Sequence, residues 1–157
     1  MASYPDILVT SPDSPLQILM AVEARLDREA LEAAIQQLRH YMAKMSCPVG
    51  LLVLPEALYI FRNRYTGIEE NAIEQIGRYQ MSEAFQRFAR ASAEHGVKAK
   101  GRLFESYVQR WLEHLPNSDD IEQLAPELKD ALETHVLPAL ESGVVRAAGP
   151  REQWSSL

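Results

Sequence analysis

The sequence predicts an α/β domain in which a small mixed β-sheet is flanked by helices, with a helical C-terminal half. The chain has 157 residues, 46% apolar and 24% charged, which is typical of a globular protein with one sizeable core. Before residue 67, the spacing of apolar residues predicts strands with one intervening helix. After residue 67, it predicts mainly helices. We therefore expect a single domain over 1–157, with a β-β-α-β-β core in 1–66 and a mainly helical segment in 67–157.

The first predicted feature is a β-hairpin. Ile7–Val9 and Leu16–Arg25 are apolar runs that favour extended structure, and the segment between them is rich in Pro, Ser and Asp. Alternation places Leu19 and Ala21 on one face of the second strand with Glu23 and Arg25. The other face carries Ile18, Met20 and Val22. Because both faces are mostly apolar, we expect this strand to be central and covered on both sides.

A helix and two more strands follow the hairpin. Asp27 is a candidate N-cap, and apolar residues recur every three or four positions from Leu31 to Met45, so we expect a helix of about 18 residues. Cys47-Pro48 ends this pattern. Val49–Leu54 and Ala57–Arg62 then predict two strands joined by a tight turn.

The second half of the chain is predicted to be mostly helical. Ser82 is a candidate cap for a helix with Phe85, Phe88 and Ala89 on its inner face, and Asp119 with Glu122 forms a capping-box pattern for a later one. The expected helices are Asn71–Gln80, Ser82 to His95-Gly96, and Arg102–Leu115. The run Val144–Ala147 suggests a short additional strand.

Composition excludes several classes of protein. A single cysteine, Cys47, rules out an intrachain disulfide and a zinc site built on several thiolates. The sequence contains neither a signal-peptide pattern nor an apolar run of membrane-spanning length, so we expect a cytoplasmic protein without a membrane partner. The net charge is −6, which neither requires nucleic-acid binding nor forbids a local basic groove. A local basic group, read as either a solvated helix face or such a groove, comprises Arg87, Arg90, Lys98, Lys100 and Arg102.

The candidate site combines residues from the hairpin and the first helix. Asp6 begins one strand, and Glu23 and Arg25 lie near the end of its partner. Two carboxylates on adjacent strands can hold a divalent cation such as Mg²⁺, and a nearby cation can stabilise charge on a phosphate. Gln37 and Tyr41 are four residues apart, so they share a face of the helix that follows.

Pro5-Asp6, Glu23-x-Arg25 and Gln37-x-x-x-Tyr41 together resemble the PD-(D/E)XK nuclease superfamily. The resemblance covers about residues 4–64 and is nearest to the RecB-type branch and to the N-terminal nuclease domain of type I restriction subunits. It implies a restriction-endonuclease-like core and a Mg²⁺- or Mn²⁺-dependent nuclease. The resemblance further implies that Asp6 and Glu23 bind the metal, that Arg25 stabilises charge, and that Gln37 and Tyr41 position the phosphate.

The chain departs from the family pattern at two points. Arg25 replaces a lysine, and a guanidinium cannot transfer a proton as an amine does. The family core also begins with a Glu-bearing helix and a strand that are missing before Asp6. The segment from Gly101 to Glu105 resembles that helix, and Val144–Ala147 would be the strand if the chain were circularly permuted. Glu105 would then be a third metal ligand. A partner chain that supplies the helix, or a degenerate core without it, are the alternatives.

Each candidate residue also has an ordinary structural explanation. Asp6 would be a strand-start residue, Glu23 and Arg25 a surface ion pair, and Gln37, Tyr41 and Glu105 surface or boundary residues. The leading hypothesis is metal-dependent hydrolysis of DNA phosphodiesters. The alternative is a catalytically inactive module that binds nucleic acid or protein, and a homo-oligomer or a partner protein is compatible with either.

Overall fold

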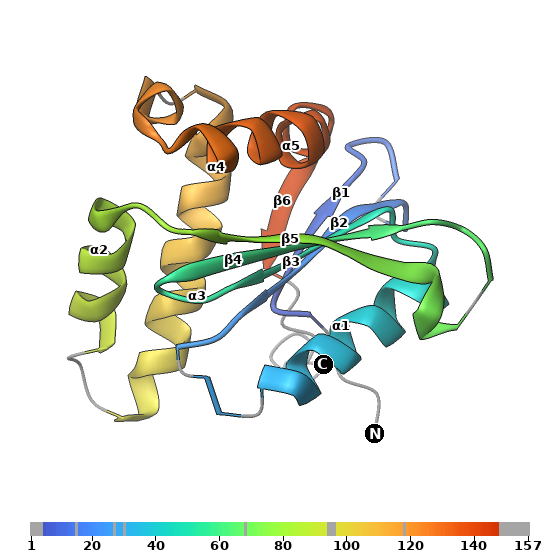
Figure 1. The fold of residues 1–157 in the computed structure, drawn as a ribbon, viewed down its shortest axis with the longest axis horizontal. Coiled ribbons are helices and arrows are strands. Elements are labelled where there is room, and N and C mark those ends of the chain that lie inside the picture. Colours follow the sequence, from blue (N-terminus) through green and yellow to red (C-terminus); the bar gives the residue numbers. More distant parts are fainter. Residues whose placement is uncertain are drawn as a thin grey trace.

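The computed structural model describes residues 5–14, 16–26, 28–29, 31–67, 69–93, 97–117 and 119–147 (Figure 1). The strands are β1 Ile7–Thr10, β2 Ile18–Ala24, β3 Val49–Val53, β4 Ala57–Asn63, β5 Ile73–Gln80 and β6 Val144–Ala147. The α-helices are α1 Leu31–Met45, α2 Glu83–Ala93, α3 Val97–His114, α4 Pro126–Ala131 and α5 Leu137–Ser142. A π-helical turn, Leu132–Val136, joins α4 to α5, and short 3₁₀ turns occupy Glu70–Ala72, Leu115–Asn117 and Asp119–Gln123.

The six strands form one mixed sheet in the order β5-β4-β3-β2-β1-β6. β2 and β3 are parallel because α1 carries the chain from one end of the sheet back to the other, and the remaining neighbours are antiparallel. β6 lies beside β1 although more than 130 residues separate them in the chain. The predicted mixed α/β architecture and the strand at Val144–Ala147 are therefore confirmed.

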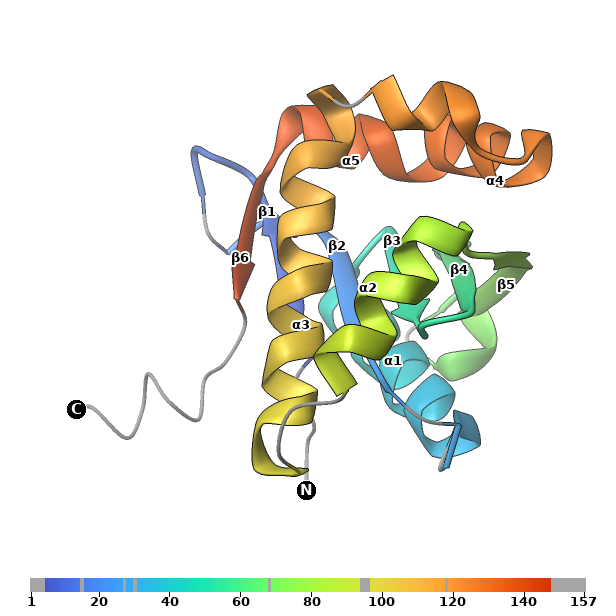
Figure 2. The same ribbon diagram turned by 90° about the vertical axis from the view of Figure 1, so that its left-hand side faces the viewer.

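Helices cover both faces of the sheet (Figures 1 and 2). On one face α1 packs through Leu38 and Met42 against Ala21, Leu52 and other strand residues. On the other face α2 to α5 form a larger cluster with side chains such as Val22, Leu51 and Ile60. β2 is central and buried from both sides, as its apolar residues predict.

A β-bulge in the hairpin changes which residues share a face. Val9 pairs with Met20 and Thr10 pairs with Ile18, so Leu19 is the extra residue. Leu19 consequently packs in the α2–α5 cluster, while Ile18 packs in the α1 cluster. The strict alternation predicted for Ile18 and Leu19 is therefore wrong, whereas that of the residues after the bulge is correct.

The predicted helix at Asn71–Gln80 is wrong, because most of this segment is the edge strand β5. Ile73, Ile76 and Tyr79 recur at three-residue steps, which resembles a helix. In the structure a bulge opposite Ile60 and Phe61 leaves Ile76 unpaired and changes the face of the strand. Ile73 then contacts the α1 cluster, whereas Ile76 and Tyr79 contact the α2–α5 cluster.

The end of α1 is fixed by local hydrogen bonds. Ser46 has a φ of 54°, and the Cys47 amide donates to the Met42 carbonyl at 2.9 Å, as at many helix C-termini. The side-chain amide of the buried Asn63 also donates to the carbonyls of Met42 and Cys47, at 3.3 and 3.2 Å. α1 is therefore tied to β4 near the predicted end of the helix, while the predicted N-cap, Asp27, lies outside the described residues.

The helical half differs from the predictions in detail. The Ser82 hydroxyl accepts a hydrogen bond from the Phe85 amide at 3.2 Å, which confirms it as the cap of α2. Phe88, however, is 62% exposed rather than internal. Asp119–Gln123 is a 3₁₀ turn instead of an α-helix, and His95-Gly96 lies outside the described residues. None of the described helices is long and apolar enough to span a bilayer.

Candidate active site

Asp6 lies directly before β1 and is held by the backbone of β2. Ile7 pairs with Val22, so the antiparallel register brings Asp6 to the end of β2 that carries Glu23. The Asp6 amide donates to the Val22 carbonyl at 2.9 Å, and Oδ2 of Asp6 accepts from the Ala24 amide at 2.8 Å. The predicted juxtaposition of the two acidic residues is thus a consequence of hairpin register.

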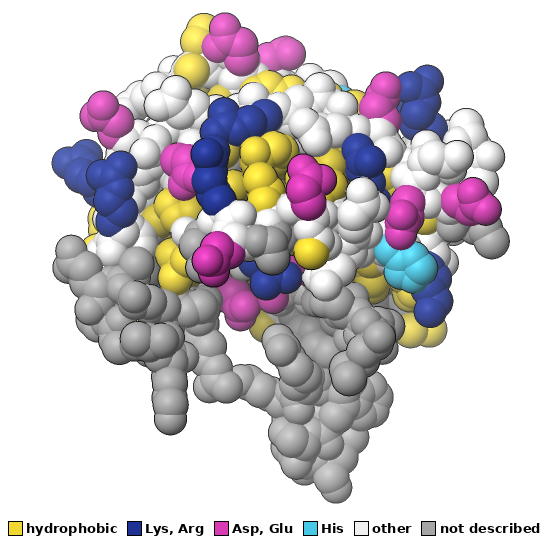
Figure 3. Space-filling model, turned by 60° about the horizontal axis from the view of Figure 1, so that its bottom comes forward, with side chains coloured by type: hydrophobic (Ala, Val, Ile, Leu, Met, Phe, Trp, Pro, Cys, Tyr) yellow, Lys and Arg dark blue, Asp and Glu magenta, His cyan; other side chains and the backbone are white. Residues whose placement is uncertain are grey.

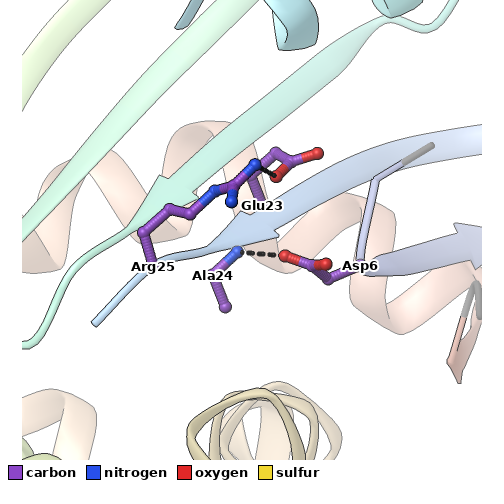
Figure 4. A network of polar contacts seen from close by, with 4 residues as sticks. All are labelled: Asp6, Glu23, Ala24 and Arg25. Carbon is purple, nitrogen blue, oxygen red and sulfur yellow. Dashed lines mark hydrogen bonds and ion pairs between the residues drawn. The ribbon is translucent and has the colours of Figure 1, made fainter. Parts of the chain in front are cut away.

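Glu23 is buried in the sheet on the α1 face, beside Arg25. Only 2% of Glu23 is exposed, and Oε2 lies 3.1 Å from Nη2 of Arg25 (Figure 4). The guanidinium folds back along β2 to reach this carboxylate, while the Asp6 carboxylate turns to the Ala24 amide. Oε2 makes no well-aligned hydrogen bond within the described part of the chain. The pair is therefore an ion contact with one under-coordinated carboxylate oxygen.

The environment of Glu23 favours its protonated form. Burial, and secondly the negative charge of Asp6, raise the pKa of Glu23 to about 8. The charge of Arg25 opposes this shift, and the charge of Glu105 adds a smaller increase. A strongly shifted pKa caused by burial and by specific charged neighbours is a feature of many functional sites.

The two helix residues predicted for the site lie differently. Tyr41 is 9% exposed and belongs to the α1 cluster that packs on the sheet face toward which Glu23 projects. Gln37, one turn earlier, is exposed. Tyr41 is therefore held by the core, whereas Gln37 is available at the surface of α1.

Glu105 belongs to the helical layer on the face of the sheet opposite α1. It lies on α3, beside the buried Phe104, and is partly buried. No group of three His, Cys, Asp or Glu side chains within the described ranges is arranged to hold a metal ion. The two-carboxylate pair with Arg25 is the part of the predicted site that the geometry brings together.

The predicted basic group is only partly described. Arg87 and Arg90 are exposed on α2, and Arg90 donates to the Gln86 side chain at 3.1 Å. The side chains of Lys98, Lys100 and Arg102 lie outside the described residues. The structure also contains a groove beside α2 that the sequence does not predict. Phe88, expected on the inner face of its helix, lines this groove, because helical spacing alone does not distinguish a core residue from a groove wall.

Carboxylate oxygens are the ligands that hard divalent cations prefer, and the under-coordinated oxygen of Glu23 has unused capacity to accept such an ion. Asp6 and Glu23 therefore fit a magnesium or manganese ion chemically, with Arg25 as an adjacent fixed positive charge. No family model, curated protein or solved structure matches the chain.

Proposed function

We propose that this chain is a metal-dependent phosphodiesterase that hydrolyses DNA. The observation that carries the proposal is the buried Glu23, which the hairpin places at the same end of the sheet as Asp6 and which pairs with Arg25 at 3.1 Å. The burial of Glu23, and secondly the negative charge of Asp6, disfavour the ionised state of Glu23. A bound cation would offset the free-energy cost of ionising Glu23 in this buried position.

The resemblance to PD-(D/E)XK nucleases gains support from the topology. The permuted arrangement requires a C-terminal helix and strand to complete the hairpin sheet. β6 pairs antiparallel with β1, and α3, which carries Glu105, precedes it and packs on the same sheet. These positions agree with a permuted core, and they favour it over a partner chain or a degenerate core.

The residues have distinct roles in the proposed reaction. Asp6 and Glu23 would hold Mg²⁺ or Mn²⁺, with Glu105 as an additional acidic group near them. When bound, the metal lowers the pKa of a water and polarises the scissile phosphate. Arg25 stabilises negative charge on the phosphate with its planar guanidinium, which remains partly exposed. Gln37 and Tyr41 position the backbone phosphate from α1.

A catalytically inactive binding module is the second candidate. Its specific support is Arg25 itself, because a guanidinium that neutralises Glu23 can replace the metal charge and cannot donate a proton. Figure 3 shows that one face of the molecule carries basic and acidic side chains interspersed around apolar atoms, without an extended patch of either sign among the described side chains. Such a surface fits a protein partner at least as well as DNA.

Cleavage assays on single- and double-stranded DNA with Mg²⁺ or Mn²⁺ distinguish the two candidates. Wild type should cleave, and Glu23→Gln, which removes the charge but keeps the shape, should not. Glu74→Gln is the matched control. Glu74 lies on the edge strand β5, which β4 and β3 separate from β2, and forms an exposed ion pair with Arg64 at 2.8 Å. Equal activity in wild type and Glu23→Gln, or no cleavage by wild type, contradicts the nuclease proposal.

A further inference from the structure

A groove lies between α2 and α3, near the 3₁₀ turns that follow α3. Figure 2 shows these two helices side by side on the face of the sheet opposite α1. The groove has a volume of about 570 Å³ and is mostly apolar, which is within the range of roughly 300–1,000 Å³ for small-molecule sites. None of the residues Asp6, Glu23, Arg25 or Glu105 lines it, so it is separate from the proposed active site.

Aromatic rings form the wall of this groove. The ring of Phe85 packs at its base, 5.1 Å from the Tyr107 ring and 5.2 Å from the Trp111 ring. Phe88 stacks on Tyr107 with 5.7 Å between ring centroids and 27° between ring planes. Because Phe88 remains 62% exposed, this stack offers an accessible aromatic surface to a planar ligand.

The charge of the groove differs from that of the chain. Arg110 and His114 line it from α3, four residues apart on one side of the helix, and both are exposed. Among the described residues no Asp or Glu lines the groove, although the chain carries 22 acidic residues against 16 basic ones. Within the part of the chain that the structure describes, no carboxylate forms an ion pair with Arg110. The groove is therefore mostly apolar, and the Arg110 guanidinium that lines it has no ion-pair partner among the described residues.

We propose that this groove binds a small molecule that has a planar apolar ring system and one carboxylate. The ring system would lie against Phe88, Tyr107 and Trp111, and the carboxylate would pair with the Arg110 guanidinium. Guanidinium and carboxylate match in two parallel hydrogen bonds, which gives such a site its preference for an anion. This inference is independent of the nuclease proposal, because it uses none of the same residues.

Two probes of the same size test the proposal. 1-Naphthylacetate carries the carboxylate, and 1-naphthylacetamide replaces it with a neutral amide. Isothermal titration calorimetry on the full chain should show that the acid binds at least about tenfold more tightly, the equivalent of 1.4 kcal/mol. Arg110→Gln should remove this preference while keeping amide binding, and Phe88→Ala should weaken both probes.

Arg87→Gln is the matched control, since Arg87 is an exposed arginine of α2 outside the groove lining. It should leave both affinities unchanged, which separates a local guanidinium effect from a general loss of positive charge. Equal affinity of wild type for the two probes, no binding of either at millimolar concentration, or an acid preference that survives Arg110→Gln would overturn the proposal. Each variant changes an exposed side chain, so loss of folding does not confound the comparison.

Discussion

Arg25 places Nη2 3.1 Å from Oε2 of Glu23, and the two side chains differ sharply in exposure: 43% for Arg25 and 3% for Glu23. The carboxylate therefore loses its hydration while its cationic partner keeps much of its own. A partly hydrated guanidinium compensates incompletely for burial, which is why the pKa of Glu23 is raised to about 8 despite the ion pair.

This pKa predicts an unusual dependence of stability on pH. The folded protein retains a proton on Glu23 that the unfolded chain releases above its ordinary pKa of 4.5. Stability should therefore fall as pH rises from about 4.5 to about 8 because of this group. Urea unfolding in EDTA should show Glu23→Gln more stable than wild type at pH 8 by more than about 1.4 kcal/mol, the equivalent of one pKa unit. The difference should become small near pH 4, below the ordinary pKa of 4.5, and an equal difference at pH 4 and pH 8 would contradict the assigned pKa.

Arg25 should be replaceable only by another cation if it stabilises charge in the reaction. Arg25→Gln should lower the cleavage rate about 10²-fold, a typical loss for one electrostatic contact to a transition state. Arg25→Lys should retain cleavage, because the ammonium keeps the positive charge beside Glu23. Steady-state cleavage of a labelled duplex measures both variants, and full activity of Arg25→Gln would remove Arg25 from the proposed mechanism.

Asp6 combines a structural and a proposed metal-binding role that two substitutions separate. Asp6→Asn keeps an oxygen that can accept from the Ala24 amide but removes the charge. It should bind Mn²⁺ at least tenfold more weakly, while its stability stays within about 1 kcal/mol of wild type. Asp6→Ala should additionally lose about 1–3 kcal/mol, because the Ala24 amide loses its acceptor. Manganese titration and urea unfolding of the two variants provide the comparison.

Gly50 controls how closely α1 approaches the sheet. A Cβ added to Gly50 would collide with the buried Met42 thioether and contact Leu38. Gly50→Ala should therefore cost about 1–3 kcal/mol of stability through overpacking. Gly67→Ala serves as the control, since nothing lies within 4 Å of its added Cβ. Thermal unfolding of both variants tests the packing, and equal effects would show that α1 sits further from β3 than described.

The sequence indicates more about where the candidate residues lie than about their chemistry. Glu23 and Arg25 are two residues apart, so strand alternation predicts that they share a face, and their 3.1 Å ion contact agrees with this. The pKa of Glu23 could not be predicted, because it depends on burial by segments distant in the chain. Gln37 and Tyr41 share a helix face by spacing, but only packing decides that Tyr41 is buried and Gln37 exposed.

The two wrong predictions for the strands have a common physical origin. Bulges at Leu19 and Ile76 each insert one residue into a strand, which changes the face of the residues beyond it. A pattern with period two then acquires a step of three, and β5 resembles a helix in sequence. The pairing of β6 with β1 joins the two ends of the chain, so a local pattern predicts the strand but not its partner.

The most direct test of the central claim is proton release on metal binding. At pH 7 Glu23 is largely protonated, so Mn²⁺ that binds to Asp6 and Glu23 must displace about one proton. Calorimetric titration in buffers of different ionisation enthalpy counts that proton. We expect release of about one proton for wild type and for Glu74→Gln, with at least tenfold weaker binding and no release for Glu23→Gln. Equal affinity and equal proton release in wild type and Glu23→Gln would contradict it.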